Sequence, residues 1–151
     1  MNAHHMMAVD YAKISVAEIM TRDVVTVIEE TTIEDLLRLF GEHHYHSYPV
    51  VTESGELSGI ISEDIVLEIL LFDRIPASGH THLSAVRSLG DDASGIMMPY
   101  PVTVSPDTSL SETADLMLRH RVDRICVVDS GKLIGILSKR DIVNEICKRR
   151  D

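Results

Sequence analysis

Apolar residues along the chain follow two alternating patterns, one typical of strands and one typical of helices. Runs rich in β-branched residues at 24–27 and 102–104 predict short strands. Apolar residues at helical spacing follow each run, and they predict an amphipathic helix with one buried face. The predicted buried positions are Ile33, Leu36, Leu37 and Phe40 in the first helix and Leu110, Ala114, Met117 and Leu118 in the second.

Polar residues mark where these helices begin. Ser109 with Glu112 fits a capping box, in which a side chain at each position satisfies a free backbone N–H of the other, and Thr32 begins a weaker version of it. Ser15 is a candidate N-cap for a short helical turn that ends in Ile19-Met20.

A hairpin and a closing helix complete each half of the chain. Both hairpins turn at a Ser-Gly pair, which suits the positive backbone angles of tight turns. The predicted strand pairs are 48–51 with 57–61 and 125–128 with 133–137. The apolar positions of the closing helices are Ile65, Val66, Ile69 and Leu70, and Ile142, Val143 and Ile146.

The two halves form an internal repeat. Ile19-Met20 returns as Ile96-Met97 at an offset of 77 residues, and Val50-Val51 returns at the same offset as Val127-Val128. Each copy reads β-α-β-β-α, so the predicted fold class is α/β. A unit of about 55 residues is marginally stable alone, and we expect the two copies to pack face to face as one pseudo-twofold domain. Residues 72–92 read as a linker that could hold a short helix at 81–89.

Composition limits the possible functions. The chain has 151 residues, 14 of them basic and 24 acidic, for a net charge of −10, which disfavours general nucleic-acid binding. The longest apolar run, at 65–72, is too short to span a membrane, and the N-terminus lacks the features of a secretion signal. Cys126 and Cys147 have neither metal-site nor disulfide-framework spacing. These features lead us to expect a cytoplasmic protein that binds neither nucleic acid nor membrane.

The ordered set of short motifs resembles a tandem pair of cystathionine-β-synthase-type (CBS) domains, also called a Bateman module. The motifs in the first copy are Ile19-Met20-Thr21, Val25-Thr26-Val27, Pro49-Val50-Val51, Gly59-Ile60-Ile61-Ser62 and Asp64. Those in the second copy are Ile96-Met97, Pro101-Val102-Thr103-Val104, Val127-Val128, Gly135-Ile136-Leu137-Ser138 and Asp141. The resemblance implies an N-terminal tail at 1–15, a first repeat at 16–71, the linker, and a second repeat at 93–148.

The resemblance implies a regulatory function. Such pairs offer two clefts that commonly bind adenosine-containing ligands such as AMP, ADP, ATP or S-adenosylmethionine, and stand-alone pairs act on a partner protein. We therefore expect a homodimeric sensor with no required cofactor, with an adenosine nucleotide as its regulatory ligand and with a protein partner that the sequence does not identify. The apolar stripes of the closing helices (Ile65 and Ile69; Ile142 and Ile146) favour self-association.

In the second copy, the residues that follow the last strand suit a nucleotide. Ser138 precedes a helix whose free N–H groups attract anions, and Lys139 and Arg140 add positive charge. The resemblance assigns the serine to phosphate and Asp141 to the ribose hydroxyls. Pro101, Val102 and Ile125 are the candidate adenine contacts. The alternative remains open that Ser138 is only an N-cap and Asp141 only a first-turn acid that suits the helix dipole.

The first copy departs from this pattern. One residue separates Ser62 from Asp64, where the second copy has two, so the carboxylate is rotated by about 100° on a helix. Glu63 stands where a basic residue would favour phosphate. We expect this weaker cleft, with Val25 and Tyr48 as further lining residues, to be empty or to take a neutral nucleoside-like ligand.

Other polar residues have competing interpretations. Arg121 and Arg124 could reach a phosphate or could be solvated cations near a helix C-terminus. Histidines at 43, 44, 46, 80 and 82 could bind a metal or respond to pH, but no second residue type completes a metal site. A ligand-free dimerisation or interaction scaffold is the main alternative function. An enzyme is disfavoured, because no nucleophile–base pair, metal set or Gly-rich phosphate loop stands out.

Overall fold

The computed structural model describes residues 9–71 and 92–150. The described chain divides into two compact units that do not coincide with the sequence repeats. The first-repeat unit runs from Val25 to Pro101. The second-repeat unit combines the described residues up to Val24 with those from Val102 onward. Each repeat thus receives the short segment that precedes the first strand of the other repeat.

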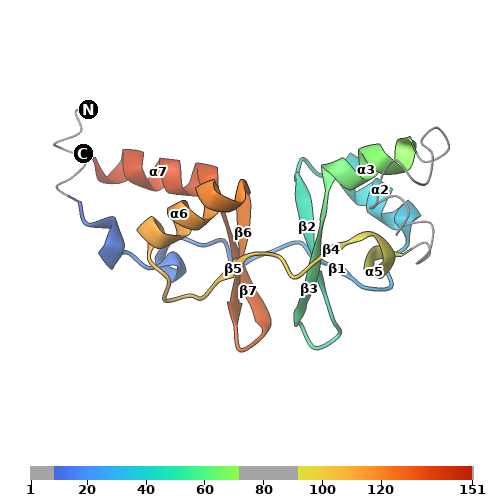
Figure 1. Cartoon of the computed structure of the whole chain (residues 1–151), viewed down its shortest axis with the longest axis horizontal. Coiled ribbons are helices and arrows are strands. Elements are labelled where there is room, and N and C mark those ends of the chain that lie inside the picture. Colours follow the sequence, from blue (N-terminus) through green and yellow to red (C-terminus); the bar gives the residue numbers. More distant parts are fainter. Residues whose placement is uncertain (1–8, 72–91, 151) are drawn as a thin grey trace. The chain divides into compact units, whose positions relative to one another are not determined.

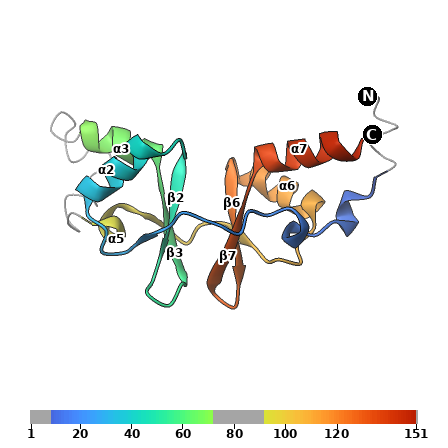
Figure 2. The same ribbon diagram turned by 180° about the vertical axis from the view of Figure 1, so that it is seen from behind.

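The second-repeat unit is a small sheet with two helices on one side (Figures 1 and 2). Its sheet has the order β5-β6-β7, with β5 parallel to β6 and β6 antiparallel to β7. Two 3-10 turns come from the N-terminal segment. The elements are η1 (Tyr11–Lys13), η2 (Val16–Glu18), β5 (Thr103–Val104), α6 (Leu110–His120), β6 (Arg124–Asp129), β7 (Lys132–Ser138) and α7 (Lys139–Arg149).

The first-repeat unit repeats this arrangement with one more strand. Its sheet has the order β1-β2-β3-β4, in which only the β1–β2 pair is parallel. The elements are β1 (Val27–Ile28), α2 (Ile33–Glu42), β2 (Ser47–Val51), β3 (Leu57–Ser62), α3 (Glu63–Leu70), α5 (Ala93–Ile96) and β4 (Met98–Pro99). The β-α-β-β-α order predicted for each copy is confirmed.

Local chemistry accounts for most element boundaries. The Ser109 side chain accepts a hydrogen bond from Glu112 N–H at 3.1 Å, and Thr32 caps α2 through Asp35 N–H at the same distance. At the start of η2, the Ser15 N–H donates to Glu18 Oε2 at 2.7 Å. Gly131 turns the second hairpin with φ of +83°, a conformation that glycine adopts without strain.

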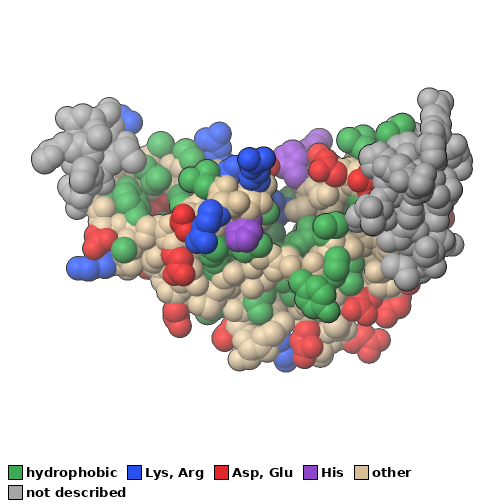
Figure 3. Space-filling model, viewed as in Figure 1, with side chains coloured by type: hydrophobic (Ala, Val, Ile, Leu, Met, Phe, Trp, Pro, Cys, Tyr) green, Lys and Arg blue, Asp and Glu red, His purple; other side chains and the backbone are tan. Residues whose placement is uncertain are grey.

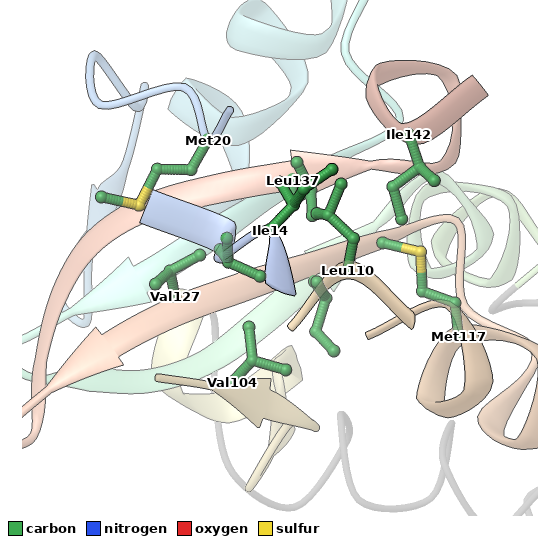
Figure 4. Packing of buried hydrophobic residues seen from close by; sticks show 10 residues of the cluster. Ile14, Met20, Val104, Leu110, Met117, Val127, Leu137 and Ile142 are labelled. Carbon is green, nitrogen blue, oxygen red and sulfur yellow. The ribbon is translucent and has the colours of Figure 1, made fainter. Parts of the chain in front are cut away.

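The exchanged N-terminal segment completes the core of the second-repeat unit. Ile14, Val16 and Met20 are buried together with apolar residues of β5, α6, β6, β7 and α7 (Figure 4). Met20 lies against the backbone of Gly135, where an added Cβ would come within 2.6 Å of the Met20 Sδ. Thr21 and Ile136 exchange two backbone hydrogen bonds of 2.9 Å each. The segment is therefore an integral part of this unit.

Several sequence predictions differ from the structure in detail. The strand predicted at 24–27 is only Val27–Ile28, because pairing with β2 begins at the register Val27–Val50. Leu118 and Leu37, predicted to be buried, are 73% and 43% exposed, because the helix faces that pack on the sheets are narrower than the apolar pattern. The helix expected at 81–89 lies outside the described residues.

Most apolar positions predicted for the closing helices contribute to the core of their own unit, but Val143 is 43% exposed. Ile65 and Ile142 are buried, and Ile69 and Ile146 pack half-buried beside them. Ile69 and Ile146 keep part of their surface exposed, and self-association through these stripes stays a prediction. Within the described parts of the chain, no helix is long and apolar enough to cross a bilayer.

Candidate ligand-binding site

The register of the second-repeat sheet brings several predicted site residues to one end of it. Arg124 is paired with Ser138 across the antiparallel strands, and Ile125 is paired with Leu137. The parallel strand β5 begins at the same end, because Thr103 pairs with Cys126. Val102 immediately precedes β5. The end of β7, the start of β6 and the start of β5 therefore meet where α7 begins.

Ser138 and Asp141 are bonded to each other at this point. The Ser138 N–H donates to Asp141 Oδ2 at 2.8 Å, and the Asp141 N–H donates to Ser138 Oγ at 3.0 Å. This is a capping box, so both side chains have the structural role that the sequence left open. A carboxylate and a hydroxyl each have further hydrogen-bonding capacity, and both residues are half-buried. The cap consequently fixes two polar groups at the sheet end, and each keeps capacity for further hydrogen bonds.

Positive charge surrounds the cap. Lys139 and Arg140 are the first two residues of α7, and both are exposed. The Lys139 Nζ lies 3.2 Å from Asp123 Oδ1, and the Lys139 N–H donates to the Asp123 carbonyl at 2.8 Å. Arg124 is half-buried on the neighbouring strand. The start of α7 thus has the character of an anion-binding position.

Arg121 has a backbone role. It ends α6 in the left-handed conformation, with φ of 55°, and its N–H donates to the Met117 carbonyl. Its side chain is exposed. Sequence reasoning had left open whether this arginine serves a ligand or a helix end, and the structure assigns its backbone to the helix end.

The candidate adenine contacts differ in their surroundings. Ile125 is 1% exposed and belongs to the core, so its side chain is not accessible to a ligand. Pro101 and Val102 are half-buried. Along the chain, Pro101 is the last residue of the first-repeat unit and Val102 belongs to the second-repeat unit. The neighbouring Cys126 is also buried, and burial raises the pKa of its thiol to about 12 in spite of the Arg124 charge. A nucleophilic role for Cys126 is therefore unsupported.

The first repeat places the equivalent residues at the matching sheet end but with different contacts. Ser47 pairs with Ser62, where the second repeat has the Arg124–Ser138 pair. Ser62 makes no side-chain cap with α3, and Asp64 is exposed at its second residue. Val25 is half-buried, two residues before β1.

Tyr48, predicted to line this weaker cleft, is part of the core instead. It is 0% exposed, and its hydroxyl donates to the Leu39 carbonyl at 2.8 Å. Its ring packs edge-to-face against Phe40 and Tyr45. In this arrangement its side chain does not reach a ligand.

Two side-chain contacts at these sites were missed by the sequence analysis. Asp123 pairs with Lys139, and His46 pairs with Glu63, its Nδ1 lying 3.3 Å from Glu63 Oε1. His46 and Asp123 are separated by the repeat offset of 77 residues, which was the signal available in the sequence.

The histidines do not assemble a metal site in the described chain. His43 ends α2 and stacks on Tyr45 with ring centroids 5.6 Å apart. Among residues 9–71 and 92–150, no three His, Cys, Asp or Glu side chains are grouped closely enough to hold a metal ion. His80 and His82 lie outside those ranges.

Comparison with known families fits this geometry. The profile of the family described as "CBS domain" matches residues 16–71 and 93–148. The chain belongs to the CBS domain family. It is a tandem CBS pair, and the resemblance seen in the sequence is confirmed.

Relatives with similar sequences include proteins that are named for their CBS domains. The chain is 31% identical to the CBS domain-containing protein CBSX1, chloroplastic, of Arabidopsis thaliana over 85% of its own length and 62% of that protein. It is 32% identical to the CBS domain-containing protein YhcV of Bacillus subtilis over 87% of its length and 86% of YhcV. The chain therefore spans less than two-thirds of the first of these relatives. Other relatives include an inosine-5'-monophosphate dehydrogenase and a zinc metalloprotease, of which it matches 22% and 32%.

Solved structures agree with the fold. CBSX2 in complex with AMP superposes with a TM-score of 0.77 at 26% identity, covering 91% of this chain and 99% of that one. The CBS domain of a bacterial CNNM/CorC family Mg²⁺ transporter in complex with ATP gives 0.70 at 26% identity, covering 95% and 93%. CBS pairs similar to this chain therefore bind adenosine nucleotides.

Proposed function

We propose that this CBS pair is a regulatory module that binds a phosphate-bearing adenosine ligand at the start of α7. Binding would favour one arrangement of the protein over another and so alter the activity of a partner protein. A ligand can shift such an equilibrium only by its differential affinity for the two states. The chain itself would act as a sensor and not as an enzyme.

One observation carries this proposal: the polar and basic residues predicted from the sequence converge at one sheet end. The Ser138–Asp141 cap offers a hydroxyl and a carboxylate within one helical turn. Lys139 and Arg140 flank it, and Arg124 lies across the strand pair. Hydroxyl and cations suit a phosphate, and a carboxylate suits a pair of ribose hydroxyls. AMP- and ATP-bound relatives of the same fold support this assignment.

Isothermal titration calorimetry with AMP, ADP, ATP and S-adenosylmethionine tests the proposal. Arg140→Ala removes an exposed cation beside the cap, and we expect it to weaken nucleotide binding roughly tenfold, as for a lost charge-assisted hydrogen bond. Lys148→Ala is the matched control, because it removes an exposed cation from the other end of the same helix. Absence of heat and of a melting-temperature shift with AMP, ADP and ATP would refute the proposal, and binding of S-adenosylmethionine alone would contradict its phosphate requirement.

A ligand-free scaffold is the second candidate, and the capping box favours it. Ser138 and Asp141 satisfy each other's backbone without any ligand, so their presence has a purely structural explanation. In that case self-association would be the function. Sedimentation at micromolar concentration with and without each nucleotide separates the two: a dimer unaffected by every ligand supports the scaffold, and a ligand-dependent change supports the sensor.

A further inference from the structure

The two repeats begin their closing helices with the same backbone bond but with side-chain pairs of opposite polarity. In the second repeat, Lys139 N–H donates to the Asp123 carbonyl at 2.8 Å; in the first, Glu63 N–H donates to the His46 carbonyl at 3.0 Å. The side chains of each pair also meet, at 3.2 Å and 3.3 Å. The helix residue is thus a cation in one repeat and an anion in the other.

The surroundings reinforce this reversal. Opposite the capping serine, the second repeat has Arg124 where the first has Ser47. Asp141 is tied into a cap, whereas Asp64 is exposed and makes no cap. A phosphate placed at the first helix start would therefore meet two carboxylates, Glu63 and Asp64, and no arginine across the strand.

Charge is also divided unequally between the units. Residues 25–101 hold 3 of the 14 basic and 13 of the 24 acidic residues, so the whole net charge of −10 lies in the first-repeat unit. The second-repeat unit, with 11 of each sign, is neutral. Lys and Arg side chains are correspondingly frequent over the second-repeat unit in Figure 3. The background potential at the first repeat thus opposes an anion as well.

We propose that the Asp123–Lys139 and His46–Glu63 pairs select ligands by charge. The second repeat takes the single phosphate-bearing ligand of the chain, and the first repeat accepts only adenosyl ligands without phosphate. This inference rests on the proposed function. It goes further by assigning the selectivity of each repeat to one exchangeable pair of side chains.

The test is to transfer the pair. The double variant His46→Asp/Glu63→Lys gives the first repeat the pair of the second. Its positions are exposed, with 76% and 55% of the wild-type side chains accessible, so folding should persist. Calorimetry should give one AMP per wild-type chain and two per double variant. The double variant places a cation at the helix start in place of a carboxylate, and the net charge of the pair rises from −1 to 0. This change should strengthen AMP binding at that position at least about tenfold.

Two controls make the result specific. Glu53→Lys makes the same Glu-to-Lys exchange at an exposed hairpin residue of the first-repeat unit. It raises the net charge by two, against one for the double variant, and it should still leave the stoichiometry at one. Lys139→Glu should remove the AMP site of the second repeat. Circular dichroism melts check that every variant is folded.

The outcomes separate this inference from the proposed function. Wild-type protein that binds two AMP molecules, a double variant that still binds one, or a Glu53→Lys variant that gains a second site would each overturn charge selection while leaving nucleotide sensing intact. Wild-type protein that binds no adenosyl ligand overturns both.

Discussion

Gly135→Ala tests whether the N-terminal segment is locked onto the second-repeat unit. A Cβ at this position would lie 2.6 Å from Met20 Sδ, 3.0 Å from Met20 Cγ and 3.1 Å from the Thr21 carbonyl oxygen. Met20 is buried in the core and has little room to move. The Thr21 oxygen is also held, because it accepts the Ile136 N–H at 2.9 Å.

Overpacking of this kind costs about 1–3 kcal/mol of unfolding free energy. For a chain of this size that corresponds to a melting temperature lower by roughly 3–10 °C. Urea unfolding followed by far-ultraviolet circular dichroism measures the change. The matched control is Gly41→Ala in α2, where an added Cβ meets nothing within 4 Å. That substitution should be neutral or stabilise by up to about 1 kcal/mol, because alanine favours the helix.

Repeating the substitution in a Met20→Ala protein tests whether Met20 causes the destabilisation. In the Met20→Ala protein the nearest two obstructing atoms are absent, so Gly135→Ala should cost less there than in the wild type. Two results would contradict this reasoning: equal stability of the Gly135→Ala and Gly41→Ala proteins, or an equal loss of unfolding free energy from Gly135→Ala in the wild-type and Met20→Ala proteins. Either would show that the close approach of Met20 and Gly135 does not hold the N-terminal segment on the second-repeat unit.

The remaining predictions concern the two thiols, Gly59, the Ser109 cap and the N-terminal segment. Cys147 should react with Ellman's reagent at pH 8 while Cys126 reacts only after unfolding, because burial raises the pKa of the Cys126 thiol from 9.0 to about 12; two fast equivalents would contradict this. The Cys126 thiol ionises at a lower pH in the unfolded chain than in the folded one. Urea titrations should therefore show a free energy of unfolding that falls as pH rises from about 9 toward 12. Gly59→Ala should destabilise at least as much as Gly135→Ala, since a backbone oxygen lies 2.8 Å from the added Cβ, and a wild-type urea midpoint would refute this. Ser109→Ala should cost about 1 kcal/mol through loss of the α6 cap, and an unchanged melting temperature would argue against the cap. A fragment of residues 93–151 should fail to fold, because its core lacks the apolar residues of the N-terminal segment, and a cooperative melt of the fragment would disprove the exchange.

The candidate site was predictable in part. The repeat comparison singled out Ser138 and Asp141, and the structure shows them cooperating in one cap. The sequence did not reveal that Tyr48 is a core residue, because a tyrosine near the start of a strand suits either a ligand or a buried hydrogen bond. It also did not pair His46 with Glu63, 17 residues apart, because that contact depends on how the loop before β2 meets the start of α3.

The two-fold repetition, the hairpins and the helix starts could all be predicted from the sequence. These features depend on interactions within a few residues, such as the Ser109–Glu112 cap and the positive φ of Gly131. Local patterns do not show that residues up to Val24 complete the core of the second repeat, or that the segment of α5 and β4 completes the first; both are seen in the folded protein. The physical reason is that an apolar turn such as Ile19-Met20 signals burial but not its partner. The partner is chosen by long-range packing, here by a glycine more than a hundred residues away whose missing side chain leaves room for Met20.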